Sequence, residues 1–359
     1  TYTNLNLAYN AGIAGTISGL GNEAVTISDT TSAANVNTIA GRTSGILTAT
    51  ITTGAVTSTL AAITNVDAND EITFTTNDTS VDASDLVALA LKVDTLGVNS
   101  VTTITEAYNT ANVATVVTNA LNITGNTELV SITGGSILAT DVNTILGATS
   151  GNVTAIVTAD TAAALNTALT NATTGTDALT LTINDTTLTS VSDLLALDGK
   201  TNVAVNASSV NSISETIANL NTAYSSAGII GLGNEAVTIT DTQSATNVNT
   251  ILGKTTGVVT AIVSADTASN LNSALTNATS TDALTLTVNG ATATASDLIS
   301  LDGKTNIAIS VTATSVSGTF TDLNNIYVTN VSNYSNLGDE NITITDTQSA
   351  TNVNTILGK

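Results

Sequence analysis

One stretch recurs along this chain and constrains its fold more than any other feature of the sequence. The best-preserved copy runs from Ala236 to Thr255, and Asn341–Lys359 repeats it almost unchanged. A third copy spans Ala24–Thr43, and a more divergent fourth copy spans Val130–Thr149. Each copy begins with alternating apolar and hydroxyl residues, continues through turn residues, and ends with apolar residues three and four positions apart. This order predicts a short strand, a turn and a short helix.

The copies define a longer repeat. Their first inward strand residues are Val25, Val130, Val237 and Ile342, which stand 105, 107 and 105 residues apart. We therefore expect one continuous array in which residues 1–24 end a preceding super-repeat, residues 25–129, 130–236 and 237–341 form three super-repeats, and residues 342–359 start the next. Because the chain opens on Thr1 inside a repeat, we expect it to be a segment of a longer polypeptide.

Each super-repeat is predicted to hold four strand–helix modules. The first module is the recurring stretch itself. In the third super-repeat, the later strands and helices are expected at Gly257–Val263 and Thr267–Leu275, at Asp282–Val288 and Ser296–Leu301, and at Ile307–Ile309 and Asp322–Tyr327. Ser244 and Ser296 stand where helix N-caps belong, and Gly147, Gly199, Gly253 and Gly303 stand where helices should end.

The module length points to one architecture. Strand, turn, helix and return take about 21–29 residues, and consecutive strands joined through a helix must be parallel with right-handed crossovers. We therefore expect a right-handed α/β solenoid, four modules to each super-repeat of about 105 residues, with short strands along one side and short helices along the other. The chain has no Pro, which agrees with strands that donate their full ladder. The alternative is an all-β solenoid in which several helices are irregular corners.

Composition limits the possible functions. The chain has 359 residues, a net charge of −22, and no Cys, His, Met or Trp. Such an acidic chain has no electrostatic footprint for nucleic acid. No apolar run approaches the length of a membrane span, so we expect no membrane insertion within this segment. The lack of oxidisable side chains fits export from the cell, and exposed Asn and Thr leave attached glycans open as partners.

Two recurring polar positions are candidate binding residues. The first is an Asn that follows Leu or Val, and it favours a ladder in which each amide bonds the backbone of the neighbouring module. The second is an outward Thr pair, which would form rows resembling the ice-binding face of some β-solenoid antifreeze proteins. The Asn positions are 6, 37, 143, 166, 221, 249, 272, 324 and 354, and the pairs are Thr73/Thr75, Thr180/Thr182, Thr238/Thr240, Thr285/Thr287 and Thr343/Thr345.

Acidic residues recur at turns. Ca²⁺ prefers clustered carboxylates and carbonyls, but most of these Asp residues stand singly, and turn or N-cap chemistry explains them better. The densest acidic patch lies between Asp67 and Asp85. We expect no cofactor and no metal site, and weak calcium binding is the one cofactor that the sequence leaves open.

The sequence predicts no enzyme. Without His or Cys there is no ordinary base or thiol nucleophile, no Gly-rich phosphate loop precedes a helix, and no acidic pair departs from the repeat. We expect no catalytic, cofactor-binding or metal-binding residues.

The segments Ser244–Val258 and Ala295–Ile307 resemble the repeats of very large bacterial surface proteins, known especially from cyanobacteria. The resemblance covers nearly the whole chain and implies an extracellular or cell-surface structural or adhesive role. We therefore expect a structural repeat segment that forms a rigid filament, sheath or surface-layer element and self-associates end to end or side by side. The alternative is an adhesin or ice-binding solenoid that uses the outward Thr rows.

Overall fold

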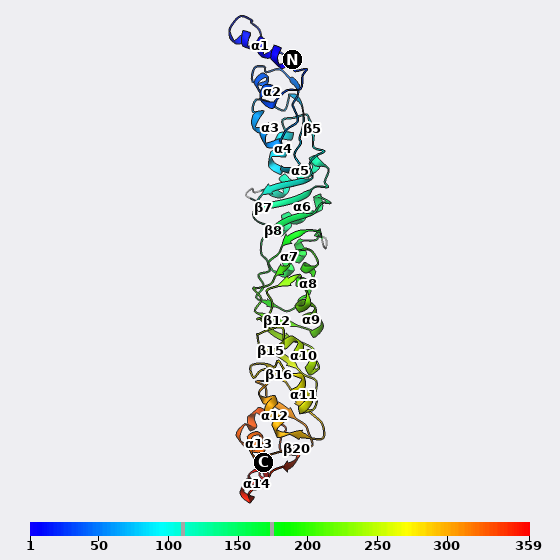
Figure 1. Ribbon diagram of the computed structural model, residues 1–359, viewed down its shortest axis with the longest axis vertical. Helices are drawn as coiled ribbons and strands as arrows, with labels where there is room; N and C mark the ends of the chain where they lie inside the picture. The colour runs from blue at the N-terminus through cyan, green and yellow to red at the C-terminus, as the bar shows by residue number, and fades with distance from the viewer. Residues whose placement is uncertain (109–111, 173–175) are drawn as a thin grey trace. The chain divides into compact units, whose positions relative to one another are not determined.

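The computed structural model describes residues 1–108, 112–172 and 176–359. Strands and helices alternate along the chain, and every strand pair in the described sheets is parallel (Figure 1). The residues group into two compact units: residues 1–159, 164–181 and 199–203 form the first, and residues 160–163, 182–198 and 204–359 form the second. The chain is therefore an α/β protein built from parallel sheets, as the repeat pattern predicts.

The first compact unit holds two sheets, with strand orders β1-β2-β3-β5 and β4-β6-β7-β8-β9. Its strands are β1 (Val25–Thr26), β2 (Leu47–Thr50), β3 (Glu71–Thr75), β4 (Ser80–Asp82), β5 (Thr95–Gly97), β6 (Thr103–Ala107), β7 (Leu129–Ile137), β8 (Val153–Val157) and β9 (Ala178–Thr180). Its helices are α1 (Tyr2–Ile13), α2 (Ala33–Ala40), α3 (Val56–Ala62), α4 (Ala83–Ala90), α5 (Val113–Thr124) and α6 (Ala139–Ala148). The division between the two units runs through α7 (Ala162–Ala168).

The second compact unit holds four sheets, with strand orders β10-β12-β14-β15-β16, β11-β13, β17-β19-β21 and β18-β20-β22. Its strands are β10 (Thr187–Leu188), β11 (Val205–Asn206), β12 (Ser212–Glu215), β13 (Ile229–Ile230), β14 (Ala236–Ile239), β15 (Val259–Ile262), β16 (Ala283–Thr285), β17 (Thr287–Val288), β18 (Ala293–Thr294), β19 (Ile309–Val311), β20 (Ser315–Gly318), β21 (Tyr334–Ser335) and β22 (Asn341–Ile344). Its helices are α8 (Ser192–Asp198), α9 (Ile217–Ser225), α10 (Ala245–Leu252), α11 (Ala268–Ala274), α12 (Ala295–Asp302), α13 (Phe320–Asn324) and α14 (Ala350–Leu357), with a π-helix at Asn325–Thr329 and a 3₁₀-helix at Val331–Asn333.

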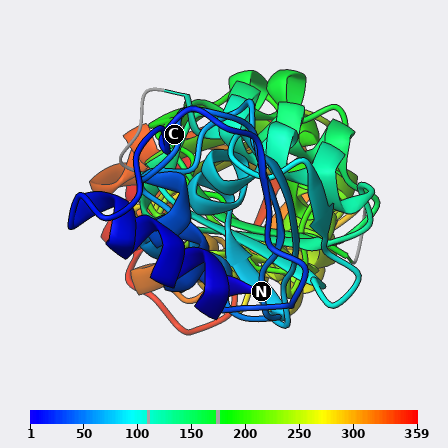
Figure 2. The ribbon, with the colours of Figure 1, turned by 90° about the horizontal axis from the view of Figure 1, so that it is seen from above.

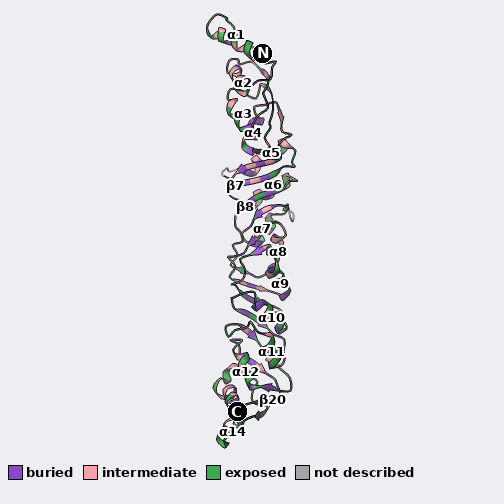
Figure 3. Ribbon diagram, viewed as in Figure 1, coloured by how far each residue is buried: buried purple, intermediate pink, exposed green. Residues whose placement is uncertain are grey.

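Each described module packs its apolar side chains inward. In β14 the inward residues Val237 and Ile239 are buried while Thr238 is exposed, and in α10 Val248 and Ile251 are fully buried. Figure 3 shows buried residues on the strands and helices along the ribbon. Two-turn helices of this kind are unstable alone, so burial against the strands must hold them in place.

The recurring stretch folds as predicted, and its neighbours pair in register. Val237 lies opposite Val259, and Thr238 lies opposite Thr260 in the next strand. Ser244 caps α10 by accepting a hydrogen bond from the backbone N–H of Asn247. Repetition of this register brings equivalent residues of successive modules side by side.

The predicted fourth module differs from the observed one. In the third super-repeat, the strand that pairs with β22 is β20, which lies between the predicted fourth strand at Ile307–Ile309 and its predicted helix, and β12 pairs in the same way with β14. Val205, which is equivalent to Ile309, instead pairs with Ile229 in a separate two-stranded sheet. The expectation of strands along one side only is therefore incomplete, because the strands form more than one sheet. The strand at Ser212–Glu215 is easily missed because Ile213 is its one inward apolar residue.

Two cap predictions were wrong. Helix α12 begins one residue before Ser296, and Thr294 caps it by accepting from the N–H of Asp297. Gly147 lies inside α6 and does not follow it. Gly253 and Gly303 do follow their helices, but with φ of −82° and −69°, so left-handed freedom is not what places glycine there.

Among the helices that the structure describes, none has both the length and the apolar character needed to cross a membrane.

Burial should decide which isoleucines matter for stability. Ile251 is fully buried in α10, whereas Ile262 in β15 is 55 % exposed. We predict that Ile251→Ala lowers the free energy of unfolding of its module by about 2–5 kcal/mol through the cavity it leaves. The matched variant Ile262→Ala should change it by about 0.5 kcal/mol. Native-state hydrogen exchange of the β14 and β15 amides measures both, and equal effects would contradict the assigned inward face.

Candidate functional site

Carboxylates from one module bond the backbone at the start of the helix in the preceding module. Asp78 Oδ2 accepts from the N–H of Val56 at 2.7 Å, and Asp241 Oδ1 accepts from the N–H of Ile217 at 3.0 Å, across 22 and 24 residues of chain. The same role falls to Asp29, Glu106, Asp185, Glu215 and Asp346. The first N–H groups of a helix have no partner within the helix, and the positive end of its dipole favours an anion there.

A second set of carboxylates bonds the start of a strand in the preceding module. Asp177 Oδ1 accepts from the N–H of Val153 at 2.9 Å, and Asp282 Oδ1 accepts from the N–H of Val259 at 2.9 Å. Asp177 and Asp282 are buried. Asp70 does the same for Leu47. These acids are therefore structural acceptors that join one module to the next.

The Asn ladder predicted from the sequence is present at three equivalent positions. Asn249 Oδ1 accepts from the N–H of Asn277 at 2.7 Å, its Nδ2 donates to Thr276 Oγ1 at 3.1 Å, and its carbonyl accepts from Asn277 Nδ2 at 3.2 Å. Asn37 and Asn143 make the same three contacts with the following module. These amides are occupied by the backbone and side chains of the neighbouring module.

The other Asn positions behave differently. Asn6 Oδ1 accepts from the Arg42 guanidinium at 2.9 Å, and Asn272 Nδ2 donates to the Asp297 carbonyl at 2.8 Å. Asn272 Oδ1 is buried and has no hydrogen-bond partner. The nine positions therefore do not form one uniform row.

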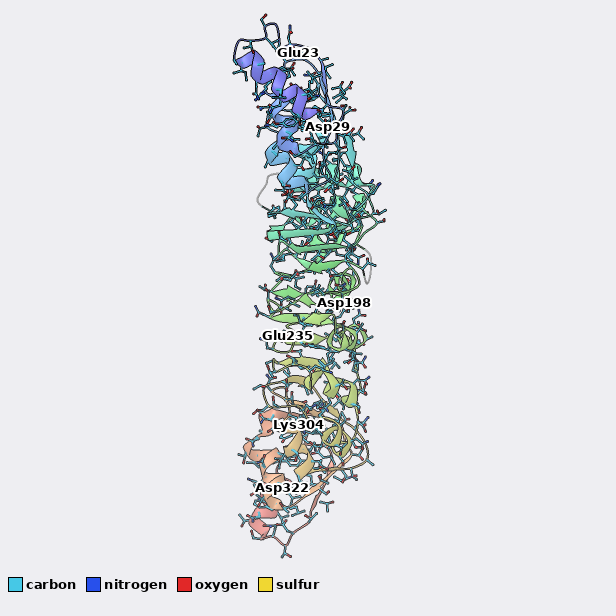
Figure 4. The ribbon with its side chains drawn as sticks, turned by 45° about the horizontal axis from the view of Figure 1, so that its top comes forward. Glu23, Asp29, Asp198, Glu235, Lys304 and Asp322 are labelled. Carbon is cyan, nitrogen blue, oxygen red and sulfur yellow. The ribbon has the colours of Figure 1, made fainter. Side chains whose placement is uncertain are left out.

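A Tyr–Glu pair recurs in three super-repeats and was not predicted. Tyr9, Tyr224 and Tyr327 each donate a short hydrogen bond to Glu23, Glu235 and Glu340 respectively. The other carboxylate oxygen accepts from loop N–H groups, such as Gly233 at 2.7 Å for Glu235 (Figure 4). The sequence signal that could have revealed this pair is the repeated Gly-Asn/Asp-Glu tripeptide. Its glycines, Gly21, Gly233 and Gly338, have φ near +130°.

The pairing changes the acidity of both groups. The hydrogen bond from Tyr9, followed by that from the Gly21 N–H, lowers the pKa of Glu23 to about 2. Burial and the bond to Glu23 raise the pKa of Tyr9 to about 12, and burial with the bond to the partner carboxylate also raises the pKa of Tyr224 and Tyr327. The pair is a neutral donor held on a carboxylate, which suits a fixed structural contact.

Three lysine side chains bond backbone carbonyls of the preceding module. Lys92, Lys200 and Lys304 Nζ donate to the carbonyls of Val66, Leu169 and Leu275 at 2.8, 2.6 and 2.6 Å. Leu169 and Leu275 directly follow helices α7 and α11 of the preceding module, where unpaired carbonyls and the negative end of the dipole favour a cation, and Val66 lies four residues beyond the end of α3. The N-terminal amine forms an ion pair with Asp29 at 4.0 Å.

The backbones of neighbouring modules approach closely at a Thr-x-Gly turn. Thr255 Oγ1 donates to the Glu235 carbonyl at 2.6 Å and accepts from the Gly257 N–H at 2.9 Å. A Cβ at Gly257 would overlap that same carbonyl oxygen. Gly45 and Gly151 occupy equivalent positions against Glu23 and Glu128. Glycine is required here because two backbones touch.

The outward hydroxyl rows are present but short. In the second compact unit, Ser214, Thr238 and Thr260 follow one another in register, and Ala283 ends the row. Thr285 lies beside the exposed Ile262. All five predicted Thr pairs point outward, with exposed or half-buried side chains.

The densest acidic patch is also occupied by hydrogen bonds. Asp67 accepts from the N–H of Asn69, Asp82 caps α4 through the N–H of Asp85, and Asp85 accepts from the Thr57 hydroxyl at 2.6 Å. Within the described ranges, no three acidic side chains are grouped closely enough to hold a metal ion.

Comparison with protein-family models, with curated proteins and with solved structures finds no match to this chain.

The Asn ladder gives a prediction with an internal control. Asn249→Ala removes the two hydrogen bonds that the Asn249 side chain makes to the next module and should lower the free energy of unfolding by about 1–3 kcal/mol. Thr250 is exposed on the same helix, and its hydroxyl donates to the Thr246 carbonyl within that helix. Thr250→Ala should therefore change the free energy of unfolding by about 0.5 kcal/mol or less. Similar losses for both variants, measured by thermal unfolding, would show that the intermodule bonds are not what matters.

Close backbone contact predicts unequal responses to Gly→Ala substitution. Gly257→Ala should destabilise by about 1–3 kcal/mol because the added methyl meets a backbone carbonyl that cannot rotate away. At Gly303 the nearest atom is the Ser300 carbonyl oxygen, an ordinary 3.5 Å from the added Cβ. Gly303→Ala should be neutral or stabilise by about 0.5 kcal/mol. Denaturant titration distinguishes the two, and a tolerated Gly257→Ala would refute the close approach.

The depressed pKa of Glu23 predicts acid sensitivity of the N-terminal segment that Tyr9 and Glu23 join. The folded pKa, about 2, lies below the ordinary value of 4.5. The stabilisation from this carboxylate is therefore fully present above pH 4.5 and is lost as the pH falls toward 2. Tyr9→Phe removes the largest cause and should move the titration of the Glu23 carboxyl carbon, followed by NMR, toward 4.5. An unchanged titration midpoint in Tyr9→Phe would contradict this assignment.

Proposed function

We propose that this chain is a structural repeat segment of a large secreted or cell-surface protein, in which the modules stack as one right-handed α/β solenoid. The segment acts as a rigid element of an extracellular filament, sheath or surface layer, and it associates with other copies end to end or side by side. Its function is mechanical and geometric, without catalysis.

This proposal rests on one observation, which is that polar side chains form hydrogen bonds to the neighbouring modules. Buried Asp177 and Asp282 bond the start of the preceding strand, Asn249 bonds the next module three times, and Lys304 bonds a carbonyl in the preceding module. Side chains that would form a binding site in another protein are here joined to neighbouring modules. Stability of such an array is a sum of module and interface terms, which favours a long spacer.

Charge supports an extracellular structural role. The chain has 28 acidic and six basic residues, and the carboxylates named above are bonded mainly to backbone N–H groups. The acidic surface charge therefore remains, keeping the molecule soluble and repelling nucleic acid and anionic membrane surfaces. Exposed Asn and Thr side chains also provide positions for glycans.

Small-angle X-ray scattering of the whole chain tests the solenoid. We expect the cross-section of a single stack and a maximum dimension that grows in proportion when one super-repeat, residues 237–341, is duplicated. A variant lacking residues 237–341 should be shorter by the same amount. A maximum dimension that does not follow the number of super-repeats would refute the continuous array.

The outward hydroxyl row favours a second candidate, an adhesive or ice-binding face. Ser214, Thr238 and Thr260 form three adjacent positions in register on one sheet face. Inhibition of ice recrystallisation that disappears in Thr238→Leu with Thr285→Leu would support it. Thr250→Leu, on the exposed side of α10, is the control and should have no effect. An inactive parent chain would remove this candidate.

A further inference from the structure

One corner of the second compact unit contains a residue pair that occurs nowhere else in the sequence. Asn289 and Gly290 form the only Asn-Gly pair of the chain. They lie between β17 and β18, and both residues are exposed. In Figure 2 the yellow and orange part of this unit, to which the pair belongs, is drawn with loops between its helices and strands. Residues 289–292 are called the Asn289 corner below.

The two earlier super-repeats build the same corner with a different second residue. In each corner the backbone N–H of an asparagine donates to a carbonyl of the preceding module. These bonds join Asn77 to Gly54 at 3.2 Å, Asn184 to Asp160 at 3.0 Å and Asn289 to Asp266 at 3.0 Å. Asp78 and Asp185 follow the first two asparagines, whereas Gly290 follows the third.

In the two earlier corners the aspartate after the asparagine is fixed by hydrogen bonds. Asp78 Oδ2 accepts from the N–H of Val56, and Asp185 Oδ2 accepts from the N–H of Ala162, both at 2.7 Å. The N–H of Asp78 also donates to Thr76 Oγ1 at 3.1 Å. These contacts restrain both aspartates and, at Asp78, occupy the backbone N–H.

Gly290 has none of these restraints. Its φ is +109°, in the region that glycine adopts readily because it has no Cβ. No residue in the described part of the chain accepts a hydrogen bond from its N–H. Its carbonyl accepts a long bond from the N–H of Thr314 at 3.4 Å. The backbone nitrogen after Asn289 is therefore exposed and free to react.

An asparagine followed by such a nitrogen undergoes an intramolecular reaction. The nitrogen of the next residue attacks the side-chain amide carbon and gives up its proton, which closes a succinimide ring. The bond from that carbon to the side-chain nitrogen breaks, and ammonia leaves. Water then opens the ring at either carbonyl and yields aspartate or isoaspartate. The first step is fastest before glycine, because no Cβ on the attacking residue hinders it.

We propose that Asn289 is a site of spontaneous covalent modification, at which attack by the Gly290 nitrogen converts the side-chain amide to aspartate and isoaspartate. Water is the only other reactant. The restrained aspartates after Asn77 and Asn184 protect those two corners from the same reaction. The modification requires neither a continuous solenoid nor an extracellular location, so it stands or falls separately from the proposed function.

The isoaspartate product changes the corner more than the aspartate product. It leads the backbone through the former side chain, which adds a carbon atom between Asn289 and Gly290, and both products add a negative charge. The corner is held to its two neighbouring modules by the bonds to Asp266 and Thr314. A longer backbone between these two bonds should loosen them.

Mass spectrometry of the folded whole chain tests the proposal at all three corners. Cleavage after Lys and Arg places the corners in separate peptides, residues 43–92, 93–200 and 255–304. After incubation at mildly alkaline pH, fragment ions should locate the replacement of NH₂ by OH at Asn289. We expect its rate to exceed the rates at Asn77 and Asn184 by a factor on the order of ten or more. Equal rates at the three asparagines would overturn the proposal.

Two substitutions test the cause. Gly290→Asp gives the third corner the Asn-Asp pair of the other two and should slow the reaction at Asn289 about tenfold. Asp185→Gly is the reciprocal variant and should make Asn184 react as fast as Asn289. Because Asp185→Gly also removes a hydrogen bond to α7, Gly290→Asp is decisive if the reciprocal variant fails to fold. An unchanged rate in Gly290→Asp would refute the role of Gly290.

The chain unfolded in denaturant gives the reference rate. The folded chain should react at Asn289 within about tenfold of that rate, because the corner is exposed and needs no unfolding to react. A larger reduction in the folded chain would mean that the structure protects Asn289, and the proposal would then be wrong.

Hydrogen exchange measures the effect on the corner. In the isoaspartate fraction, isolated by chromatography, the Thr314 amide should exchange several-fold faster than in fresh protein. The Val259 amide, which donates to Asp282 in another part of the unit, is the control and should be unchanged. Equal exchange of Thr314 in both samples would contradict the loosening.

Discussion

The hydrogen bond from a backbone N–H at the start of one module to a carboxylate in the next is the contact on which the rest of this structure depends. Two-turn helices cannot hold themselves together, and their first N–H groups lack partners within the helix. Here Asp78 and Asp241 satisfy them from 22 and 24 residues away. Local order in one module is therefore completed by the module that follows it.

The same contact explains how a chain with a charge of −22 folds with so few cations. The carboxylates described above bond backbone N–H groups and Tyr hydroxyls, while Lys92, Lys200 and Lys304 bond carbonyls beyond the opposite ends of helices. Acidic side chains at helix starts and lysines near helix ends both complement the helix dipole. The excess of acidic residues in this protein therefore helps to join its modules.

The sequence by itself determined the repeat, the parallel α/β class, the inward face of strands such as Val237–Ile239, the Ser244 cap and the ladder role of Asn37, Asn143 and Asn249. These follow from local periodicity and from spacing that repeats. Only the tertiary structure decided that β12 and not the strand at Val205 pairs with β14, that single Asp residues cap distant helices, and that Tyr224 bonds Glu235. Those contacts join residues whose separation in sequence varies from 11 to more than 20, so no local period reveals them. These contacts depend on how many residues each module contains before the chain comes back to the equivalent position in the next module.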